Sequence, residues 1–462
     1  IRDLRMSRGL GDVYKRKDVS ENQELPIAAS DVDCILLTHA HIDHSGLIPL
    51  MYVNGFRGQV YSTSATAQLC EIMLRDSAHI QMFEAEWRNR KAARSGGKLK
   101  EFVPLYDMDA AVNVCKQFVG CEYDRVYDIA EGIKIRFTDV GHLLGSASIE
   151  VWATEKTENG DVTEKIVFSG DIGNINKPII KDPKHVRDAD YVVMESTYGN
   201  RSHGGTPNYV EDLTDIFKRT FERGGNVVIP SFAVGRTQEL LYIIRKIKED
   251  NLVGRDFDVY MDSPLAIEAT NIFVKNVESC FDDEAVELVR KGINPLSFPG
   301  LKYATTGDES KQINFDPNPK VIISSSGMCE AGRIRHHLKH NLWRPECTIV
   351  FVGYQAVGTT GRIIVDGAEE IKLFGEPIQI KAEIVQLKGS SGHADKDGLL
   401  CWINAFDTKP KKVFVVHGED SVCDEFTECL KEEYGYDAMA PYTGGSYDPV
   451  SYTHLTLPTI LR

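Results

Sequence analysis

Three histidines and one aspartate occur within six consecutive residues near the start of this 462-residue chain: His39, His41, Asp43 and His44. Three histidines at these offsets would arise by chance only about 0.01 times in a chain of this length. Imidazole nitrogens and carboxylate oxygens suit a borderline cation such as zinc. A tight loop after a strand can direct alternate side chains to one metal and the next pair to a second. We therefore interpret the segment as a metal-binding loop, in preference to solvated or capping histidines.

His142, Asp171 and His417 are further candidate ligands. Each follows a short apolar run that we predict to be a strand, and each has a glycine beside it that allows a sharp turn. One histidine at a strand end is more often structural than a ligand. Ligand sites gather at the carboxyl ends of strands in open α/β sheets. We therefore expect these three residues to join the first motif.

The elements that position these residues form an α/β pattern, in which short β-branched runs alternate with amphipathic helical stretches. The length allows two domains. From about Tyr198 the pattern predicts a second α/β unit, and the glycines near residues 353–361 mark the return to the first domain. Two more strands are predicted at residues 384–385 and 413–416.

Composition excludes some classes of protein. No apolar run approaches the roughly 18 residues that span a bilayer, and no secretory signal is visible. Ten cysteines without a C-x-x-C pair indicate reduced thiols and a cytoplasmic protein. The net charge of −15 argues against coating nucleic acid with the whole surface, although a local basic groove remains compatible with a nuclease.

Both ends of the chain resemble translated adapter sequence, at residues 12–16 and 450–459. We expect residues 1–17 and 449–462 to carry no fold information.

Several motifs resemble those of one enzyme superfamily. Residues 38–46, His142 and residues 169–171 resemble the metal motifs of the metallo-β-lactamase superfamily. Segments 195–198, 391–395 and 416–419 resemble the three extra motifs of its β-CASP nuclease branch, and segments 230–239 and 261–264 resemble that branch's inserted domain. The resemblance covers residues 33–447.

The resemblance implies a fold and a ligand set. The fold is an αββα metallo-β-lactamase sandwich of residues 18–197 and 355–448, with an inserted α/β β-CASP domain at residues 198–354. Two zinc ions are implied. The implied ligands are His39, His41 and His142 for one zinc, Asp43, His44 and His417 for the other, and Asp171 as the bridge.

The resemblance also bears on the substrate. Members that act on DNA usually lack a histidine at the last motif, so His417 favours RNA. One departure concerns the family's first motif, an aspartate that lies before His39 and supports the histidine loop. Neither Asp3, Asp12 nor Asp18 can be assigned to it.

Hydrolysis of a phosphodiester requires a nucleophile and a proton donor. Two metals about 3.5–4 Å apart can share a hydroxide and polarise a phosphoryl oxygen, so Asp43 is counted as catalytic as well as a ligand. Glu195 paired with His393 is our candidate general acid, because a carboxylate keeps a neighbouring imidazole protonated. The alternative makes Glu195 a capping or ion-pair residue. The resemblance implies 5′-phosphate and 3′-hydroxyl products.

Substrate-binding candidates lie in the second unit. Ser325, Ser326 and Gly327 precede a predicted helix and could cradle a phosphate with backbone N–H groups. Arg236 follows a glycine in a turn. The basic stretch at residues 333–340 is as compatible with a solvated helix face as with RNA contact.

The favoured function is a zinc-dependent ribonuclease, endonucleolytic and/or 5′–3′ exonucleolytic, that acts on single-stranded RNA. The alternatives are a non-catalytic RNA-binding scaffold subunit, a DNA nuclease and a small-molecule hydrolase on the same fold. The sequence leaves open whether the protein forms a homodimer.

Overall fold

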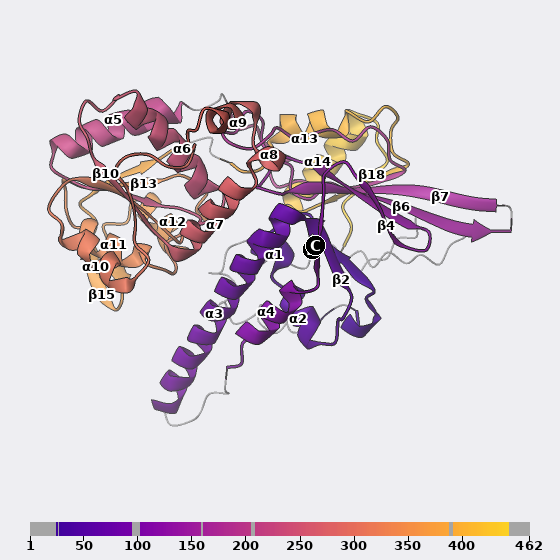
Figure 1. Ribbon diagram of the computed structural model, residues 1–462, viewed down its shortest axis with the longest axis horizontal. Helices are drawn as coiled ribbons and strands as arrows, with labels where there is room; N and C mark the ends of the chain where they lie inside the picture. Colours follow the sequence, from indigo (N-terminus) through magenta and orange to yellow (C-terminus); the bar gives the residue numbers. More distant parts are fainter. Residues whose placement is uncertain are drawn as a thin grey trace.

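The computed structural model describes residues 25, 27–94, 102–158, 160–204, 208–387 and 391–442. The chain forms two units that lie side by side (Figure 1). The expectations for residues 1–17 and 449–462, and for Asp3, Asp12 and Asp18, lie outside the described residues.

The first unit contains two sheets that face each other. One is a seven-stranded sheet of order β18-β17-β8-β7-β6-β5-β4. Its strands are β4 (Val126–Ala130), β5 (Ile133–Asp139), β6 (Ala147–Thr157), β7 (Gly160–Phe168), β8 (Tyr191–Glu195), β17 (Lys412–Val416) and β18 (Ala438–Met439). The other is a parallel sheet of β1 (Cys34–Leu36), β2 (Gln59–Thr63) and β3 (Phe118–Cys121). Phe137 and Ile149 of the large sheet pack with Leu36 and Tyr61 of the small one.

Helices cover the outer faces of both sheets. Val192 and Met194 of β8 pack with Trp402 and Phe426, which belong to the two helices over the large sheet. These helices are α13 (Lys396–Ile403) and α14 (Asp420–Glu432). The small sheet is covered by α2 (Ile48–Val53), α3 (Ser64–Arg94) and α4 (Met108–Cys115), whose apolar side chains surround Val60. The order helix, sheet, sheet, helix confirms the predicted αββα sandwich.

The inserted unit is built on a six-stranded parallel sheet of order β11-β10-β12-β9-β13-β16. Its strands are β9 (Val227–Pro230), β10 (Asp258–Asp262), β11 (Leu301–Tyr303), β12 (Lys320–Ser324), β13 (Thr348–Phe351) and β16 (Glu383–Gln386). Every residue of β9, β12 and β13 is buried, as expected for parallel strands with helices on both faces.

Alternate residues of these strands pack against two sets of helices. Val227 and Ile229 face the side of α5 (Tyr209–Glu222), α6 (Arg236–Glu249) and α7 (Pro264–Lys275). Val228 and Ile349 face the side of α10 (Gly307–Phe315), α11 (Ile334–Asn341) and α12 (Thr360–Val365). The remaining elements of the inserted unit are α8 (Val277–Cys280), α9 (Asp283–Arg290) and the hairpin β14 (Glu370–Leu373) to β15 (Glu376–Gln379).

One strand lies in a different sheet from the one expected. The predicted return to the first unit at residue 355 would put the strand near Ile384 in the sandwich, whereas β16 pairs with β13 of the inserted sheet. A short strand of apolar residues has the same pattern in either sheet, so the sequence could not distinguish them. We propose that the inserted unit extends to about residue 387.

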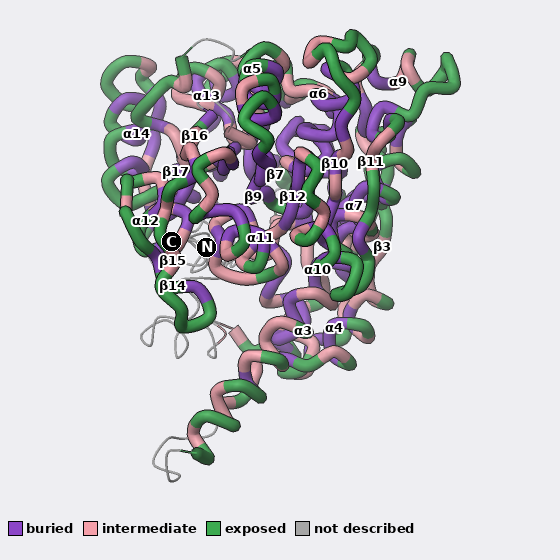
Figure 2. The backbone as a smooth tube through the Cα atoms, turned by 90° about the vertical axis from the view of Figure 1, so that its left-hand side faces the viewer, coloured by how far each residue is buried: buried purple, intermediate pink, exposed green. Residues whose placement is uncertain are grey.

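The two units are joined by apolar packing. One continuous cluster of buried side chains includes Leu69 and Leu74 of α3 together with Ala269 and Phe273 of α7. Beyond Ala85, α3 has no buried residue, and this end of the helix projects from the body (Figures 1 and 2). Among the described residues, no helix is both long and apolar enough to cross a membrane.

Candidate metal centre

Sharp turns after strands of the first unit position the candidate ligands. Gly141 and Gly170, beside two of these ligands, have φ angles of 65° and 59°, and His417 itself has φ 52°. A Cβ atom at Gly141 would lie 2.7 Å from the Lys181 carbonyl oxygen, and one at Gly170 would lie 2.8 Å from Thr38 Cβ. Both positions therefore require glycine, as the sequence indicated.

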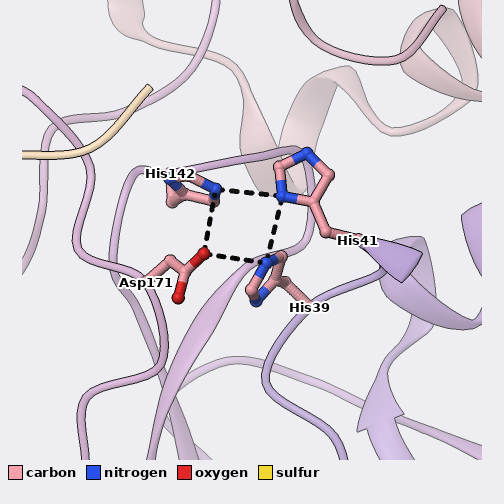
Figure 3. Close-up of side chains that lie close together, drawn as sticks. All are labelled: His39, His41, His142 and Asp171. Atoms are coloured by element: carbon pink, nitrogen blue, oxygen red, sulfur yellow. Dashed lines mark hydrogen bonds and ion pairs between the residues drawn. The ribbon is translucent and has the colours of Figure 1, made fainter. Parts of the chain in front are cut away.

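Four ligand atoms converge in a first group, drawn in Figure 3: His39 Nε2, His41 Nδ1, His142 Nε2 and Asp171 Oδ2. His41 Nδ1 lies 3.1 Å from both His39 Nε2 and His142 Nε2. Asp171 Oδ2 lies 3.3 Å from His39 Nε2 and 3.5 Å from His142 Nε2. A tetrahedral zinc site with bonds of about 2.0–2.1 Å has ligand–ligand edges of about 3.3–3.4 Å. The group therefore fits one zinc ion.

A second group lies on the other side of the same aspartate. His44 Nε2 is 3.1 Å from His417 Nε2, and Asp171 Oδ1 is 3.2 Å and 3.4 Å from these two atoms. Asp43 Oδ2 is 3.9 Å from His44 Nε2 and 3.8 Å from His417 Nε2. Only the two distances to Asp43 are longer than those in the first group, so the second group also suits one cation.

Asp171 connects the two groups through its two oxygens. The residue is 1% exposed, and Oδ1 has no hydrogen-bond partner among the described residues. A buried carboxylate oxygen without a donor is costly unless a cation compensates it. The nearest nitrogens are His44 Nε2 at 3.2 Å and His417 Nε2 at 3.4 Å, and a cation held with these two histidines would compensate this oxygen.

The outer nitrogens of several ligand histidines are held by hydrogen bonds. A hydrogen bond at the ring nitrogen that points away from the metal fixes the tautomer and the ring orientation. The other ring nitrogen is then available to bind the metal. The pairs are His39 Nδ1 with Thr38 Oγ1 at 3.2 Å, His142 Nδ1 with Gly392 O at 3.1 Å, and His417 Nδ1 with Thr197 Oγ1 at 3.0 Å. The sequence analysis did not identify Thr38 or Thr197 as supports, because nothing marks a threonine beside a ligand as a hydrogen-bond partner.

Burial and neighbouring charges separate the two groups electrostatically. Burial and the His39 imidazole lower the pKa of His41 to about 3, and burial also lowers the pKa values of His39 and His142. These three imidazoles are therefore neutral, which is the form that binds metal. For His44, burial opposes the charged form, but Asp171 and then Asp43 outweigh it and raise its pKa to about 9.

Glu195 and His393, predicted to pair, do lie in contact. Glu195 ends β8 and is 1% exposed. His393 Nδ1 lies 3.0 Å from Oε2 and 3.2 Å from Oε1 of Glu195, and the carboxylate also accepts the Ile172 N–H. Burial opposes protonation of His393, but the Glu195 carboxylate and then Asp171 raise its pKa to about 9. The imidazole can therefore carry a proton at neutral pH.

A second arrangement of cations is conceivable around the same pair. Ligand atoms of Glu195, His393, His417 and Asp171 also lie within 4.8 Å of one another. A metal held there would make His393 a ligand instead of a proton donor. The two uses of His393 differ in whether its removal lowers the metal content.

The predicted substrate-binding residues lie at the carboxyl edge of the inserted sheet. Ser325 and Ser326 follow β12, and the Ser325 hydroxyl donates to Ser263 Oγ at 3.0 Å. A Cβ atom at Gly327 would lie 3.1 Å from both the ring and the backbone nitrogen of Phe232. Since α11 begins only at Ile334, these residues do not cap that helix directly, as the expected phosphate cradle would require.

Arg236 and two residues of the basic stretch, Arg333 and His337, make internal contacts. The Arg236 side chain is 15% exposed and forms an ion pair with Glu239. Arg333 Nη1 donates to Asp262 Oδ1 at 2.7 Å, and the fully buried His337 lies 2.6 Å from Asp262 Oδ2. These two residues of the basic stretch therefore stabilise the inserted unit and do not form a solvated face.

The chain also matches known protein families and individual proteins in sequence. Residues 237–364 match the Beta-Casp domain family, and residues 377–441 match the family described as Zn-dependent metallo-hydrolase RNA specificity domain. Over 390 residues the chain is 34% identical to Ribonuclease TTHA0252 of Thermus thermophilus, covering 84% of this chain and 82% of that protein. The chain belongs to the β-CASP branch of the metallo-β-lactamase superfamily. The expected metal-dependent hydrolase of the RNA-processing kind is thereby confirmed at the level of the family.

Two other relatives illustrate the range of this β-CASP branch. An RNase J-like protein of Methanocaldococcus jannaschii is 31% identical over 421 residues, which cover 90% of this chain and 86% of that protein. Transcription termination factor FttA of Methanosarcina mazei is 32% identical over 421 residues. That match covers 89% of this chain but only 62% of the factor, so the chain spans less than two thirds of its length.

Proposed function

We propose that this β-CASP protein is a ribonuclease that binds two zinc ions and hydrolyses RNA phosphodiester bonds to 5′-phosphate and 3′-hydroxyl products. The observation that carries the proposal is that Asp171 contacts two groups of ligands, one through each carboxylate oxygen, with the Glu195–His393 pair beside them. A single-metal hydrolase needs only one of these groups.

The proposed ligand roles follow the two groups. His39, His41 and His142 would hold one zinc, and Asp171 would be a ligand shared with the other. The ligands of the other zinc are Asp43, His44 and His417. When bound, the two ions would supply a nucleophilic water at neutral pH and neutralise charge on the phosphodiester.

The remaining chemistry belongs to the chain itself. Glu195 orients the His393 ring and keeps it protonated, because the carboxylate is buried and contacts Nδ1. We assign His393 the donation of a proton to the departing 3′-oxygen, which would otherwise leave as an alkoxide. The His393 side chain is 22% exposed and therefore accessible to a substrate, whereas the Glu195 side chain is only 1% exposed.

Substrate binding is proposed to use the carboxyl edge of the inserted sheet. A Cβ atom at Gly235, in the turn after β9 of this sheet, would lie 3.1 Å from Leu143, the neighbour of His142, so this edge lies beside the first ligand group. Ser325, Ser326 and Gly327 lie there beside Phe232, whose ring is 45% exposed and could stack on a base of single-stranded RNA. Arg236, which forms an ion pair with Glu239, begins α6 in the turn after β9 at the same edge.

The test combines metal analysis with cleavage of matched substrates. The purified protein is expected to contain two zinc ions per chain and to cleave single-stranded RNA in preference to DNA of the same sequence. Asp43→Ala should abolish cleavage. Labels at the 5′ and 3′ ends separate endonucleolytic from 5′–3′ exonucleolytic products. Bound metal without cleavage of any RNA would instead support a scaffold subunit, and equal cleavage of DNA would overturn the RNA assignment.

A further inference from the structure

Lys177 lies where the first unit meets the inserted unit. It follows Asp171 by six residues, on the loop after β7, and its side chain is only 11% exposed. The Lys177 ammonium donates to the backbone carbonyl oxygen of His142 at 2.8 Å. The backbone of a proposed zinc ligand is therefore held by a buried cation.

The same ammonium contacts the inserted unit. Lys177 Nζ lies 3.4 Å from Glu239 Oε1, and the other oxygen of Glu239 pairs with Arg236. Glu239 and Arg236 belong to the first turn of α6. One carboxylate of the inserted unit is therefore shared by a cation from each unit.

Apolar packing brings the same two segments together. A Cβ atom at Gly235, the residue before α6, would lie 3.1 Å from Leu143 Cδ1. Leu143 is the neighbour of His142 and is buried. The loop that carries His142 therefore packs directly against the start of α6. The ion pair between Lys177 and Glu239 forms beside this contact.

The charges at this contact depend on each other. A buried ammonium without its carboxylate would be destabilised. A charged donor makes a stronger bond to a carbonyl oxygen than a neutral one does, so the pairing strengthens the hold on His142.

We infer that Lys177 is a positioning residue, which fixes the backbone of His142 so that its Nε2 faces the first ligand group, and that Glu239 holds the Lys177 ammonium in place from the inserted unit. Lys177 thereby connects the loop that carries His142 to the inserted unit. The inference rests on the proposed zinc site, but it does not depend on the substrate.

The test measures zinc affinity without RNA, by competition with a chelator, alongside thermal unfolding. Lys177→Met should weaken binding of the first zinc about tenfold, as loss of a supporting hydrogen bond outside the ligand set typically does. Lys177→Arg, which keeps the charge and the donors, should bind zinc close to the original affinity.

Lys320→Met provides a matched control. Lys320 is also a buried lysine, with a 1% exposed side chain that pairs with Asp316, but it lies on β12 of the inserted sheet. This variant should lower the unfolding temperature and leave zinc affinity unchanged. If both Met variants lose zinc equally, or if neither does, the positioning role is wrong.

Glu239→Gln keeps the test decisive if Lys177→Met does not fold. This variant retains the Lys177 donor but removes the carboxylate that holds it, so zinc affinity should fall, but by less than in Lys177→Met. Unchanged affinity in Glu239→Gln would overturn the proposed link to the inserted unit. Because no RNA is used, a failure here is distinct from a failure of the ribonuclease proposal.

Discussion

The two ligand groups differ in enclosure and in composition. In the first group the side chains of His39, His142 and Asp171 are 0%, 2% and 2% exposed, and only His41 is partly exposed. In the second group the side chains of Asp43, His44 and His417 are 21%, 20% and 11% exposed. The difference indicates a closed position that anchors one cation and a more open position that faces the substrate.

The largest loss of activity is expected at Asp171, because this residue belongs to both ligand groups. Asp171→Asn should reduce RNA cleavage by about a thousandfold or more, because loss of a shared charged ligand removes several kcal/mol of transition-state stabilisation. Mass spectrometry of the intact protein should detect loss of zinc from both positions. Selective loss from one position would contradict the bridging role.

Smaller effects, on zinc content, should distinguish the enclosed metal position from the more exposed one. His417→Ala should release the more exposed zinc and keep the enclosed one, so the protein would retain one zinc per chain. His142→Ala should do the reverse or lose both, since the enclosed position anchors the site. Zinc content under chelator dialysis measures this, and equal sensitivity of both variants would remove the distinction between the groups.

His393→Ala tests the proton donor beside these groups. Cleavage should slow by about a hundredfold, the usual contribution of a general acid, while zinc content stays unchanged. Single-turnover rates at saturating zinc give the comparison. A drop in zinc content would show that His393 binds metal together with Glu195, Asp171 and His417.

The smallest effect concerns the loop that carries the enclosed group. Asp139, three residues before His142, is buried, and burial raises its pKa to about 7. Between about pH 4 and pH 7 the folded chain therefore holds a proton that the unfolded chain releases, so its contribution to stability is present below about pH 4 and is lost as the pH rises through 7.

Asp139→Asn should remove this dependence. At pH 8 the variant should be more stable by about 1–3 kcal/mol, because Asn keeps the oxygen that accepts the Gly141 N–H without ionising. Urea unfolding at pH 5 and pH 8 is the measurement. An identical pH profile for both proteins would show that Asp139 does not ionise in this range.

The sequence allowed prediction of the centre better than of its surroundings. Histidines and aspartates beside strand-end glycines indicate a site, because few other roles need them at such spacing. Lys177 and Thr197 gave no such signal, since their roles arise from contacts between residues far apart in the chain. β16 was assigned to the sandwich because a strand of apolar residues does not encode which sheet it joins.

Arg236 illustrates a further limit. An arginine after a glycine suggests a phosphate contact, yet the fold places Glu239 one helical turn away, where it pairs with Arg236. The basic stretch at residues 333–340 was ambiguous for the same reason, because Asp262 supplies the partner for both Arg333 and His337. Charge in a sequence shows that a partner is needed, and the fold decides which one.

The central claim is that two cations lie on either side of Asp171. Anomalous X-ray scattering at the zinc edge from crystals of the zinc-loaded protein tests it directly. We expect two peaks about 3.5–4 Å apart, one among His39, His41 and His142 and one among Asp43, His44 and His417. A single peak, or a peak between Glu195 and His393, would contradict the account.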